Sequence, residues 1–318
     1  MTAPLRGPGF AKLRELADVV YDPWIEQTPL RIYSAEQLAD RIATETADVL
    51  VVEGDSVAGP VLEQRLRAIA STRGDPNNVD IAAATAAGVP VLNTPGRNAD
   101  AVAEMTVALL LAATRQLLPA DADVRSGNIF RDGSIPYQRF RAWEIAGRTA
   151  GLVGLGAVGR ATRWRLAGLG MRVIAHDPYN DEARHELDEL LAEADVVSVH
   201  APVTDDTVGM IATPQFAAMR DGVVFLNTAR AQLHDTDALV DALRGGKVAA
   251  AGLDHFAGEW LPTDHPLVGM PNVVLTPHIG GATWNTEARQ AQMVADDLEA
   301  LLSGQTPAHI VNPEVLAS

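Results

Sequence analysis

Gly151-Leu-Val-Gly-Leu-Gly-Ala-Val-Gly159 combines an apolar segment with three closely spaced glycines. Its apolar start is typical of a buried strand, and it passes through Gly154-x-Gly156-x-x-Gly159 into a predicted helix over Ala157–Gly168. In this pattern the first glycine permits a tight turn, the second lets backbone approach a pyrophosphate, and the third packs helix against strand. The helix N-terminus adds free N–H groups and a positive dipole end. The stretch therefore predicts a dinucleotide-binding strand-turn-helix unit.

An acidic residue closes the next predicted strand. Asp177 follows Gly159 by eighteen residues, a spacing that suits a carboxylate bonded to the ribose hydroxyls of a dinucleotide. The same carboxylate would repel a 2′-phosphate, and no Arg or Lys follows it in residues 178–180. The pattern favours NAD over NADP. A structural turn followed by a surface aspartate is the alternative, which the strand before the glycines and the helix after them argue against.

Strands alternate with helices on both sides of this unit, which predicts an α/β protein with a Rossmann-type doubly wound parallel sheet. The strands expected in that sheet are 149–153, 172–176, 196–200, 223–227, 249–253 and 273–276, with helices such as 157–168 and 235–244 between them. Earlier in the chain the expected strands are 18–21, 49–52, 66–71 and 89–92, with helices at 10–17, 35–42 and 79–87, and they form a smaller α/β unit. A long apolar helix over 101–118, capped by Asn98 or Asp100, a polar segment over 119–147 and a last helix over 285–302 complete the pattern.

Composition narrows the possible functions. A chain of 318 residues usually forms two domains. Its net charge of -16 argues against nucleic acid or anionic lipid as a main partner, because both need an excess of Lys and Arg. With no cysteine, a thiol nucleophile and cysteine-bound metal are excluded. We see neither a membrane-spanning apolar run nor a secretory leader, and we expect a cytoplasmic protein.

The beginning of the chain is unusual for such a unit, which normally opens on a buried strand. Met1–Leu5 reads as the stump of a first strand, followed at once by Gly7, Pro8 and Gly9. We expect the true start codon to lie slightly upstream.

Three chemically active side chains follow the later strands, at the sheet edge where doubly wound folds bind ligands. Arg230, Glu259 and His278 suit 2-keto acid reduction. A guanidinium binds a carboxylate and polarises its carbonyl, an imidazole donates and accepts a proton, and a carboxylate orients that imidazole. Taken singly, each is as readily a solvated surface residue, and His200 is a rival at another strand end. The set of three is more persuasive than its members.

With these residues placed, the chain resembles the D-isomer-specific 2-hydroxy acid dehydrogenase family, which includes phosphoglycerate, glycerate and hydroxypyruvate/glyoxylate dehydrogenases. The resemblance covers nearly the whole chain. The matching segments, in the family's order, are Asn78-Val-Asp80, Gly88–Pro95, Ala103-Glu104, Gly154–Gly159 with Asp177, Asn227–Arg230, Gly252–Asp254, Glu259, and Thr276–Gly280.

The resemblance implies a role for each matched residue. It makes Arg230 the binder of the substrate carboxylate, His278 the acid/base and Glu259 its partner, with Asp254 holding the nicotinamide amide. The cofactor contacts that it implies are Gly154, Gly156, Ala157, Val158, Gly159, Asp177, Ala201, Thr228, Ala229, Asp254 and Gly280. The substrate is then a small anionic 2-keto or 2-hydroxy acid, and the cofactor is NAD.

Family architecture further implies a discontinuous, flavodoxin-like substrate domain over 1–96 and 285–318, a Rossmann domain over 97–284, and a homodimer formed through residues 98–147. The loop that binds the substrate carboxylate departs from the family: it contains Arg73 and Gly74, with Asp75 also standing where small residues are common. Arg73 either anchors a second anionic group of the substrate or points to solvent. Arg230 is followed by Ala231 rather than the usual glycine, and His255 stands where an apolar residue is common.

Two other classes of function are alternatives to a dehydrogenase. The family's corepressor-type relatives sense NAD(H) and bind transcription factors with little turnover, and similar residues do not exclude that role. A hydrolase would need a Gly-x-Ser-x-Gly turn or a metal-spaced His/Glu cluster, and we find neither. Little chain remains after residue 305, so we do not expect the regulatory domain that some phosphoglycerate dehydrogenases carry.

Overall fold

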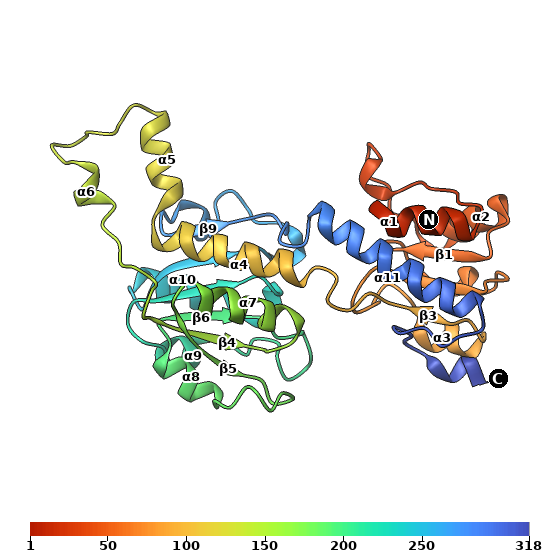
Figure 1. Ribbon diagram of the computed structural model, residues 1–318. Helices are drawn as coiled ribbons and strands as arrows, with labels where there is room; N and C mark the ends of the chain where they lie inside the picture. The colour runs from red at the N-terminus through yellow and green to blue at the C-terminus, as the bar shows by residue number, and fades with distance from the viewer. Residues whose placement is uncertain (318) are drawn as a thin grey trace. The chain divides into compact units, whose positions relative to one another are not determined.

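The computed structural model describes residues 1–317, which divide into two compact units (Figure 1). The smaller unit combines residues 1–97 with residues 283–317, and the larger unit is Asn98–Ala282. The domain boundaries expected from the sequence were 96/97 and 284/285, and Ser318, the end of that range, lies outside the described residues. Each unit is built on its own parallel sheet.

The larger unit contains a six-stranded sheet of order β5-β4-β6-β7-β8-β9 in which every neighbouring pair is parallel. The strands are β4 (Thr149–Val153), β5 (Arg172–His176), β6 (Val196–Val199), β7 (Val223–Asn227), β8 (Val248–Leu253) and β9 (Val273–Leu275). All six predicted strands are present, with ends that differ by at most one residue. The chain runs from β4 outward to β5 and then returns to β6 on the other side of β4. The topological switch point therefore lies between β4 and β6, where such sheets bind ligands.

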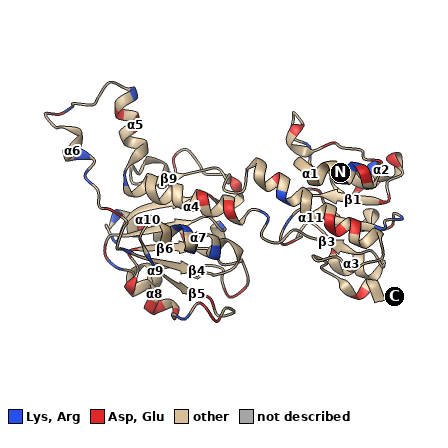
Figure 2. Ribbon diagram, in the orientation of Figure 1, with Lys and Arg blue, Asp and Glu red and all other residues tan. Residues whose placement is uncertain are grey.

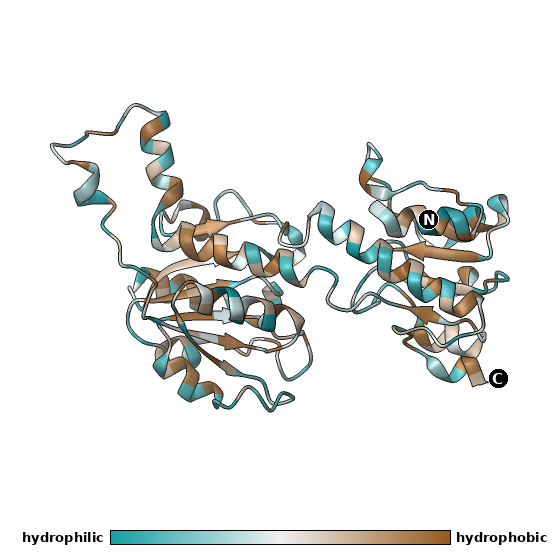
Figure 3. Ribbon diagram, in the orientation of Figure 1, coloured by the Kyte–Doolittle hydropathy of each residue, from teal (hydrophilic) through white to brown (hydrophobic). Residues whose placement is uncertain are grey.

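Helices cover both faces of this sheet. One face packs against α8 (Leu187–Glu193), α9 (Thr213–Ala218) and α10 (Thr236–Arg244), and the other against α4 (Ala99–Thr114) and α7 (Ala157–Gly168). Strand residues are almost entirely apolar (Figure 3), and Arg172 is the only Lys, Arg, Asp or Glu in any described strand (Figure 2). Because parallel strands are buried on both faces, this composition is what the fold requires.

One glycine sets the packing of α4 on the sheet. A Cβ at Gly252 in β8 would lie 2.8 Å from the Cβ of Leu109. A larger residue there would push α4 off the sheet, so the glycine fixes the close approach of helix and strand.

The smaller unit has a three-stranded parallel sheet of order β1-β2-β3. Its elements are α1 (Gly7–Leu16), α2 (Ala35–Glu45), β1 (Val49–Val52), β2 (Ala68–Ser71), α3 (Ile81–Ala86), β3 (Val91–Leu92) and α11 (Trp284–Leu302). One face packs against α2 and α3, and the other against α1 and α11. A Cβ at Gly9 would lie 2.3 Å from the backbone nitrogen of Gln292, so α1 and α11 touch through their backbones.

The predicted strand over 18–21 is wrong. These residues form no ladder and bond to the first residues of the chain instead: the Met1 amino group donates to Val20 O at 2.8 Å, and the side-chain hydroxyl of Tyr21 bonds to the backbone of Leu5. Residues 1–5, predicted as the stump of a first strand, are extended but form no β-strand. Thr2 N donates to Val51 O at 2.9 Å, which places this extended segment beside β1.

The predicted helix over 101–118 is two helices. α4 ends at Thr114, Gln116 adopts a left-handed conformation with φ of +52°, and α5 (Leu117–Arg125) follows, with the short α6 (Pro136–Arg139) beyond it. Pro119 gives the physical reason, because proline in a helix interior clashes with the preceding turn but is accepted in the first turn of a new helix. Asn98 precedes α4 without a capping side-chain bond.

No single described helix is both long enough and apolar enough to cross a membrane. α4 and α5 meet the length and composition test only as a pair, with a bend of 64° between them. α4 is accounted for as a core helix, since it packs on β7 and β8.

Candidate active site

The glycine-rich turn lies at the switch point of the larger sheet. Gly154 has a φ of +98°, and a Cβ there would lie 2.7 Å from the backbone nitrogen of Ala201. A Cβ at Gly159 would lie 2.3 Å from Gly154 O, whereas nothing lies within 4 Å of a Cβ at Gly156. Two of the glycines are thus required by packing, and the middle one borders open space. The first and third glycines match the turn and packing roles that the motif predicts, and the approach of a pyrophosphate to Gly156 stays a prediction.

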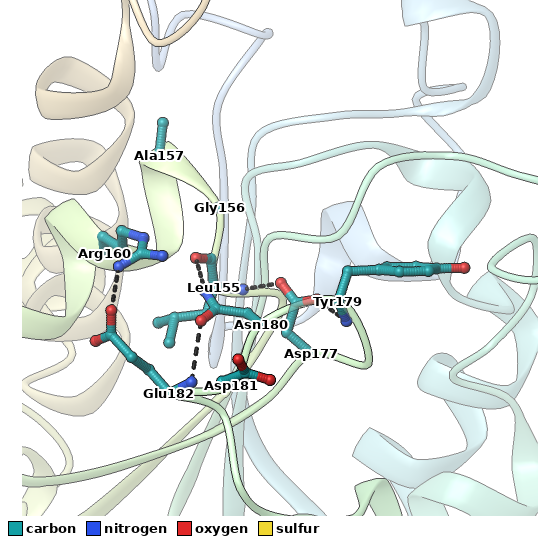
Figure 4. Close-up of a pocket in the computed structure, with 9 residues that line it drawn as sticks. All are labelled: Leu155, Gly156, Ala157, Arg160, Asp177, Tyr179, Asn180, Asp181 and Glu182. Atoms are coloured by element: carbon teal, nitrogen blue, oxygen red, sulfur yellow. Dashed lines mark hydrogen bonds and ion pairs between the residues drawn. The ribbon is translucent and has the colours of Figure 1, made fainter.

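A pocket of about 730 Å³ opens beside this turn (Figure 4). Asp177 lies on its wall, where Oδ2 accepts a hydrogen bond from Leu155 N at 2.8 Å and Oδ1 accepts one from Tyr179 N at 3.0 Å. The carboxylate is therefore fixed next to the start of α7. The pocket's one Arg or Lys, Arg160, forms an ion pair with Glu182. Ala157 lines the same pocket, and Val158 follows it in the first turn of α7.

Asp254 organises the loop that carries His278. It is buried after β8, and its Oδ1 accepts hydrogen bonds from Thr276 Oγ1 at 2.6 Å and Ile279 N at 3.0 Å. Its Oδ2 accepts one from Gly280 N at 2.7 Å. Three bonds on both sides of His278 fix that loop. The nicotinamide contact predicted for Asp254 stays a prediction, and the loop clamp is a role that the sequence reasoning missed.

His278 and Glu259 form a close pair. The His278 Nδ1 lies 2.9 Å from Glu259 Oε1, and both side chains are partly open to solvent. Both residues have left-handed backbone, with φ of +54° and +56°. For residues other than glycine this conformation costs about 1 kcal/mol or more each, and such strain is common at functional sites. A carboxylate on Nδ1 fixes a proton there and leaves Nε2 to exchange a proton with a bound molecule.

His255 packs against this pair. Its ring centroid lies 3.7 Å from that of His278 at an interplanar angle of 49°, and its side chain is only 4% exposed. Burial, followed by the nearby charges of His278 and Arg230, lowers the pKa of His255 to about 3. His255 is therefore a neutral ring. In the sequence, His255 stands out only as a departure from the family pattern, and its contact with His278 was not predicted.

Arg230 presents its guanidinium to solvent at the end of the loop after β7. Its Nη1 donates to Ala229 O at 2.6 Å, and no carboxylate within residues 1–317 lies within ion-pair distance. Asn227 holds the loop: its Nδ2 donates to Arg230 O at 2.8 Å and lies 2.9 Å from His234 Nδ1, while its Oδ1 accepts from Ala229 N at 3.0 Å. Asn227 is a positioning residue that sequence reasoning assigned no role. A polar residue closing an otherwise apolar strand was the available signal.

Two other predicted residues have defined surroundings. The hydroxyl of Thr228 bonds to that of Thr106 in α4 at 2.9 Å. His200, the rival acid/base, is half-buried, and its Nε2 lies 2.9 Å from Ser198 Oγ, while burial of the ring lowers its pKa to about 4. This environment makes His200 a neutral structural residue.

Arg73 and Gly74 belong to the smaller unit. Arg73 is half-buried, its Nε donates to Glu53 O at 2.6 Å and its Nη1 donates to Asn77 Oδ1 at 2.5 Å. The side chain is thus tethered to its own unit. Gly74 lies beside Pro95, whose Cα would be 3.4 Å from a Cβ at that position.

The buried histidines make stability depend on pH. Burial lowers the pKa of both His200 and His234 to about 4 from the ordinary value near 6.5, so below pH 6.5 the unfolded chain binds more protons than the folded one. The free energy of unfolding keeps its full histidine contribution above pH 6.5 and decreases as the pH falls toward 4. At pH 5 the expected loss is about 2 kcal/mol per histidine. Urea unfolding at pH 7.5 and pH 5 measures this loss. The His200→Gln variant should lose less free energy of unfolding between these two pH values than the native protein. An equal loss in the native protein and the variant would contradict the lowered pKa of His200.

Comparisons with known proteins identify the family of this chain. Residues 107–280 match the model of the D-isomer specific 2-hydroxyacid dehydrogenase NAD binding domain. The chain is 37% identical to a glyoxylate reductase of Thermofilum pendens over 97% of this chain and 92% of that protein. It is 39% identical to a D-3-phosphoglycerate dehydrogenase of Mycobacterium leprae over 93% of this chain, but spans only 56% of that protein.

Solved structures show the same two-domain fold. The TT0316 protein of Thermus thermophilus superposes with a TM-score of 0.82 at 35% identity, covering 98% of both chains. A D-isomer specific 2-hydroxyacid dehydrogenase of Lactobacillus delbrueckii, in its NAD-complexed form, gives a TM-score of 0.79 at 26% identity and 96% coverage of both. The chain therefore belongs to the D-isomer specific 2-hydroxyacid dehydrogenase family and is an oxidoreductase of that family.

Proposed function

We propose that this protein interconverts a small D-2-hydroxy acid and its 2-keto acid, with NAD as the cofactor, His278 and Glu259 as the acid/base pair, and Arg230 as the binder of the substrate carboxylate. The observation that carries the proposal is the 2.9 Å contact between His278 Nδ1 and Glu259 Oε1, with His278 on a loop that Asp254 clamps.

The residues around the glycine turn fit a dinucleotide, because Gly154 and Gly159 leave no room for a side chain and Gly156 borders open space. The residues that would hold the cofactor are Gly154, Gly156, Ala157, Val158, Gly159, Asp177, Ala201, Thr228, Ala229, Asp254 and Gly280. When bound, the nicotinamide exchanges a hydride with the substrate carbon.

The chain's own residues handle the proton and the carboxylate. Arg230 pairs with the carboxylate in a fork geometry and orients the adjacent carbonyl. In reduction, His278 Nε2 donates a proton to the carbonyl oxygen, and in oxidation it takes the proton from the hydroxyl group. Glu259 stabilises the imidazolium and holds its tautomer.

We also propose Arg73 and Gly74 as substrate-binding residues. Two of Arg73's nitrogen atoms already have partners within the smaller unit, which leaves Nη2 for an anion. A substrate with a second anionic group would use that nitrogen, whereas a simple 2-keto acid would not.

The test is loss of NADH absorbance with the purified protein over a panel of 2-keto acids, with and without a phosphate or second carboxylate. Turnover of at least one class is expected, and a preference for doubly anionic acids would give Arg73 its role. A protein that binds NADH yet turns over none of the acids would overturn the proposal.

The preference for NAD rests on Asp177. Its carboxylate stands beside the pocket, and the one cation there, Arg160, is already paired with Glu182. Asp177→Ala should therefore raise the ratio of kcat/KM with NADPH to that with NADH by at least about tenfold, which corresponds to relief of one like-charge contact. The ratio is measured rather than either value alone, because Asp177 also accepts a hydrogen bond from Leu155 N, and its removal should weaken the binding of both cofactors. Asp181→Ala, in the same pocket, is the control. An equal change in both variants would refute the ribose assignment.

We also propose that residues 98–147 form a homodimer interface. In Figure 1, α5 and α6 project from the six-stranded sheet. This segment exposes a run of large apolar side chains, among them Phe130 at 75% and Tyr137 at 87%. Such an exposed set is typical of a surface covered by a partner. Sedimentation velocity should give a dimer for the native chain and a monomer for Phe130→Glu, with Trp164→Glu on α7 as a control that stays dimeric. A native monomer would exclude the interface.

A further inference from the structure

Three side chains with metal-binding chemistry meet at the proposed acid/base pair. His255, Glu259 and His278 each offer a ligand atom, and these atoms all lie within 4.8 Å of one another. Glu259 Oε1 is 2.9 Å from His278 Nδ1 and 3.9 Å from His255 Nδ1. Ligand atoms in a tetrahedral zinc site lie about 3.3–3.5 Å apart, given metal–ligand bonds near 2.0–2.2 Å. The observed separations lie on both sides of that range.

We propose that His255, Glu259 and His278 form a reversible Zn²⁺ site, and that Zn²⁺ bound there inhibits the dehydrogenase by removing His278 from acid/base exchange. The binding site stands on the geometry alone, whereas the inhibition rests on the function proposed above.

The donor set selects the kind of metal. Two imidazoles and one carboxylate suit Zn²⁺ and its transition-metal neighbours, whereas Mg²⁺ and Ca²⁺ prefer all-oxygen sites. Three protein ligands with a fourth position open to water is a common zinc arrangement. No other set of three or more such side chains within residues 1–317 meets the same distance test.

Burial and exposure also suit a metal that enters and leaves. The side chain of His255 is 4% exposed and is held in place, while those of Glu259 and His278 are 57% and 42% exposed and have room to adjust toward the spacing that a metal needs. The positive charge of Arg230 near His255 opposes a cation and weakens the site. The balance favours reversible binding over a permanent structural metal.

The inhibition follows from which nitrogen the metal takes. With Zn²⁺ on Nδ1 of His278, the ring carries its remaining proton on Nε2. That nitrogen cannot then accept a proton from the substrate hydroxyl, and giving its proton up would leave an imidazolate. Glu259 would at the same time lose its hydrogen bond to the ring. Both directions of the proposed reaction are blocked.

The binding test uses the full chain without a polyhistidine tag, titrated with ZnCl₂ in competition with a chromophoric zinc indicator. We expect one Zn²⁺ per chain. His255→Leu, which restores an apolar residue in a buried position, should weaken binding by at least about tenfold, since it removes one of three ligands. His185→Leu, in the same unit but outside the cluster, is the matched control and should bind as the native chain does. Mg²⁺ should not compete.

The activity test measures turnover with and without Zn²⁺, each variant against its own metal-free rate, and reverses the effect with a chelator. Native protein should be inhibited over the concentrations at which it binds Zn²⁺, and His255→Leu should need at least about tenfold more. Stoichiometric binding that His255→Leu leaves unchanged would overturn the site. If Zn²⁺ binding depends on His255 but the protein turns over no 2-keto acid in metal-free buffer, the zinc site is supported and the proposed function is contradicted. Turnover that Zn²⁺ does not slow at full occupancy would overturn the inhibition.

Discussion

His278→Ala should lower kcat by about 10²–10⁴-fold while leaving the Kd for NADH largely unchanged, because general acid/base catalysis contributes on that order and the side chain holds no part of the glycine turn. The loop itself should survive the change, since Asp254 anchors it through Thr276, Ile279 and Gly280 rather than through the imidazole. Steady-state rates with the best 2-keto acid, together with NADH fluorescence titration, measure both quantities.

A second variant separates chemistry from backbone strain. His278 has a φ of +54°, a conformation that asparagine tolerates better than alanine. His278→Asn should therefore be as inactive as His278→Ala but closer to the native protein in thermal stability. The kcat of Glu259→Gln should lie between those of the native protein and His278→Ala, because glutamine keeps a hydrogen-bonding partner for the ring but lacks the negative charge of the carboxylate. If both His278 variants retained activity, the proton would have to come from another group, and the mechanism proposed for this site would be wrong.

Most of the sheet could be predicted from the sequence, because strands buried on both faces must be continuous apolar runs. All six strands of the larger sheet follow from that rule. The predicted strand over 18–21 failed because its apolar character matches a strand, while Val20 O accepts from the Met1 amino group and the Tyr21 hydroxyl bonds to Leu5. No local pattern encodes these tertiary contacts. The break at Gln116 had a local signal in Pro119, but the helical periodicity continued through it.

The candidate site divides in the same way. Arg230, Glu259 and His278 could be predicted because parallel strands bring their carboxyl ends to one edge. The roles of Asn227 and Asp254 as clamps could not, because each depends on which backbone groups face a carboxylate or amide from another loop. The packing of His255 on His278 is a contact between segments more than twenty residues apart, and its chemistry follows from that distance and burial rather than from any motif.

Arg230→Lys should lower kcat/KM by about 10²–10³-fold even though the positive charge is retained, because a lysine ammonium cannot form the two parallel bonds that a guanidinium makes with a carboxylate. Asn227 anchors the backbone of the loop through the carbonyl of residue 230, so the substitution should leave the Cα atom of residue 230 in place. The Kd for NADH should change little. Arg244→Lys, at the end of α10, is the matched control and should behave as the native enzyme.

A substrate analogue shows whether the lost interaction is the one with the carboxylate. The native enzyme should discriminate strongly against a 2-keto amide, in which the carboxylate is replaced by a neutral group. If Arg230 recognises that carboxylate, the lysine variant should discriminate far less, because two changes that remove the same contact are not additive. Additive losses would mean that the carboxylate is bound elsewhere, with Arg73 in the smaller unit the next residue to test. A parallel loss of NADH affinity would make Arg230 part of the cofactor site instead.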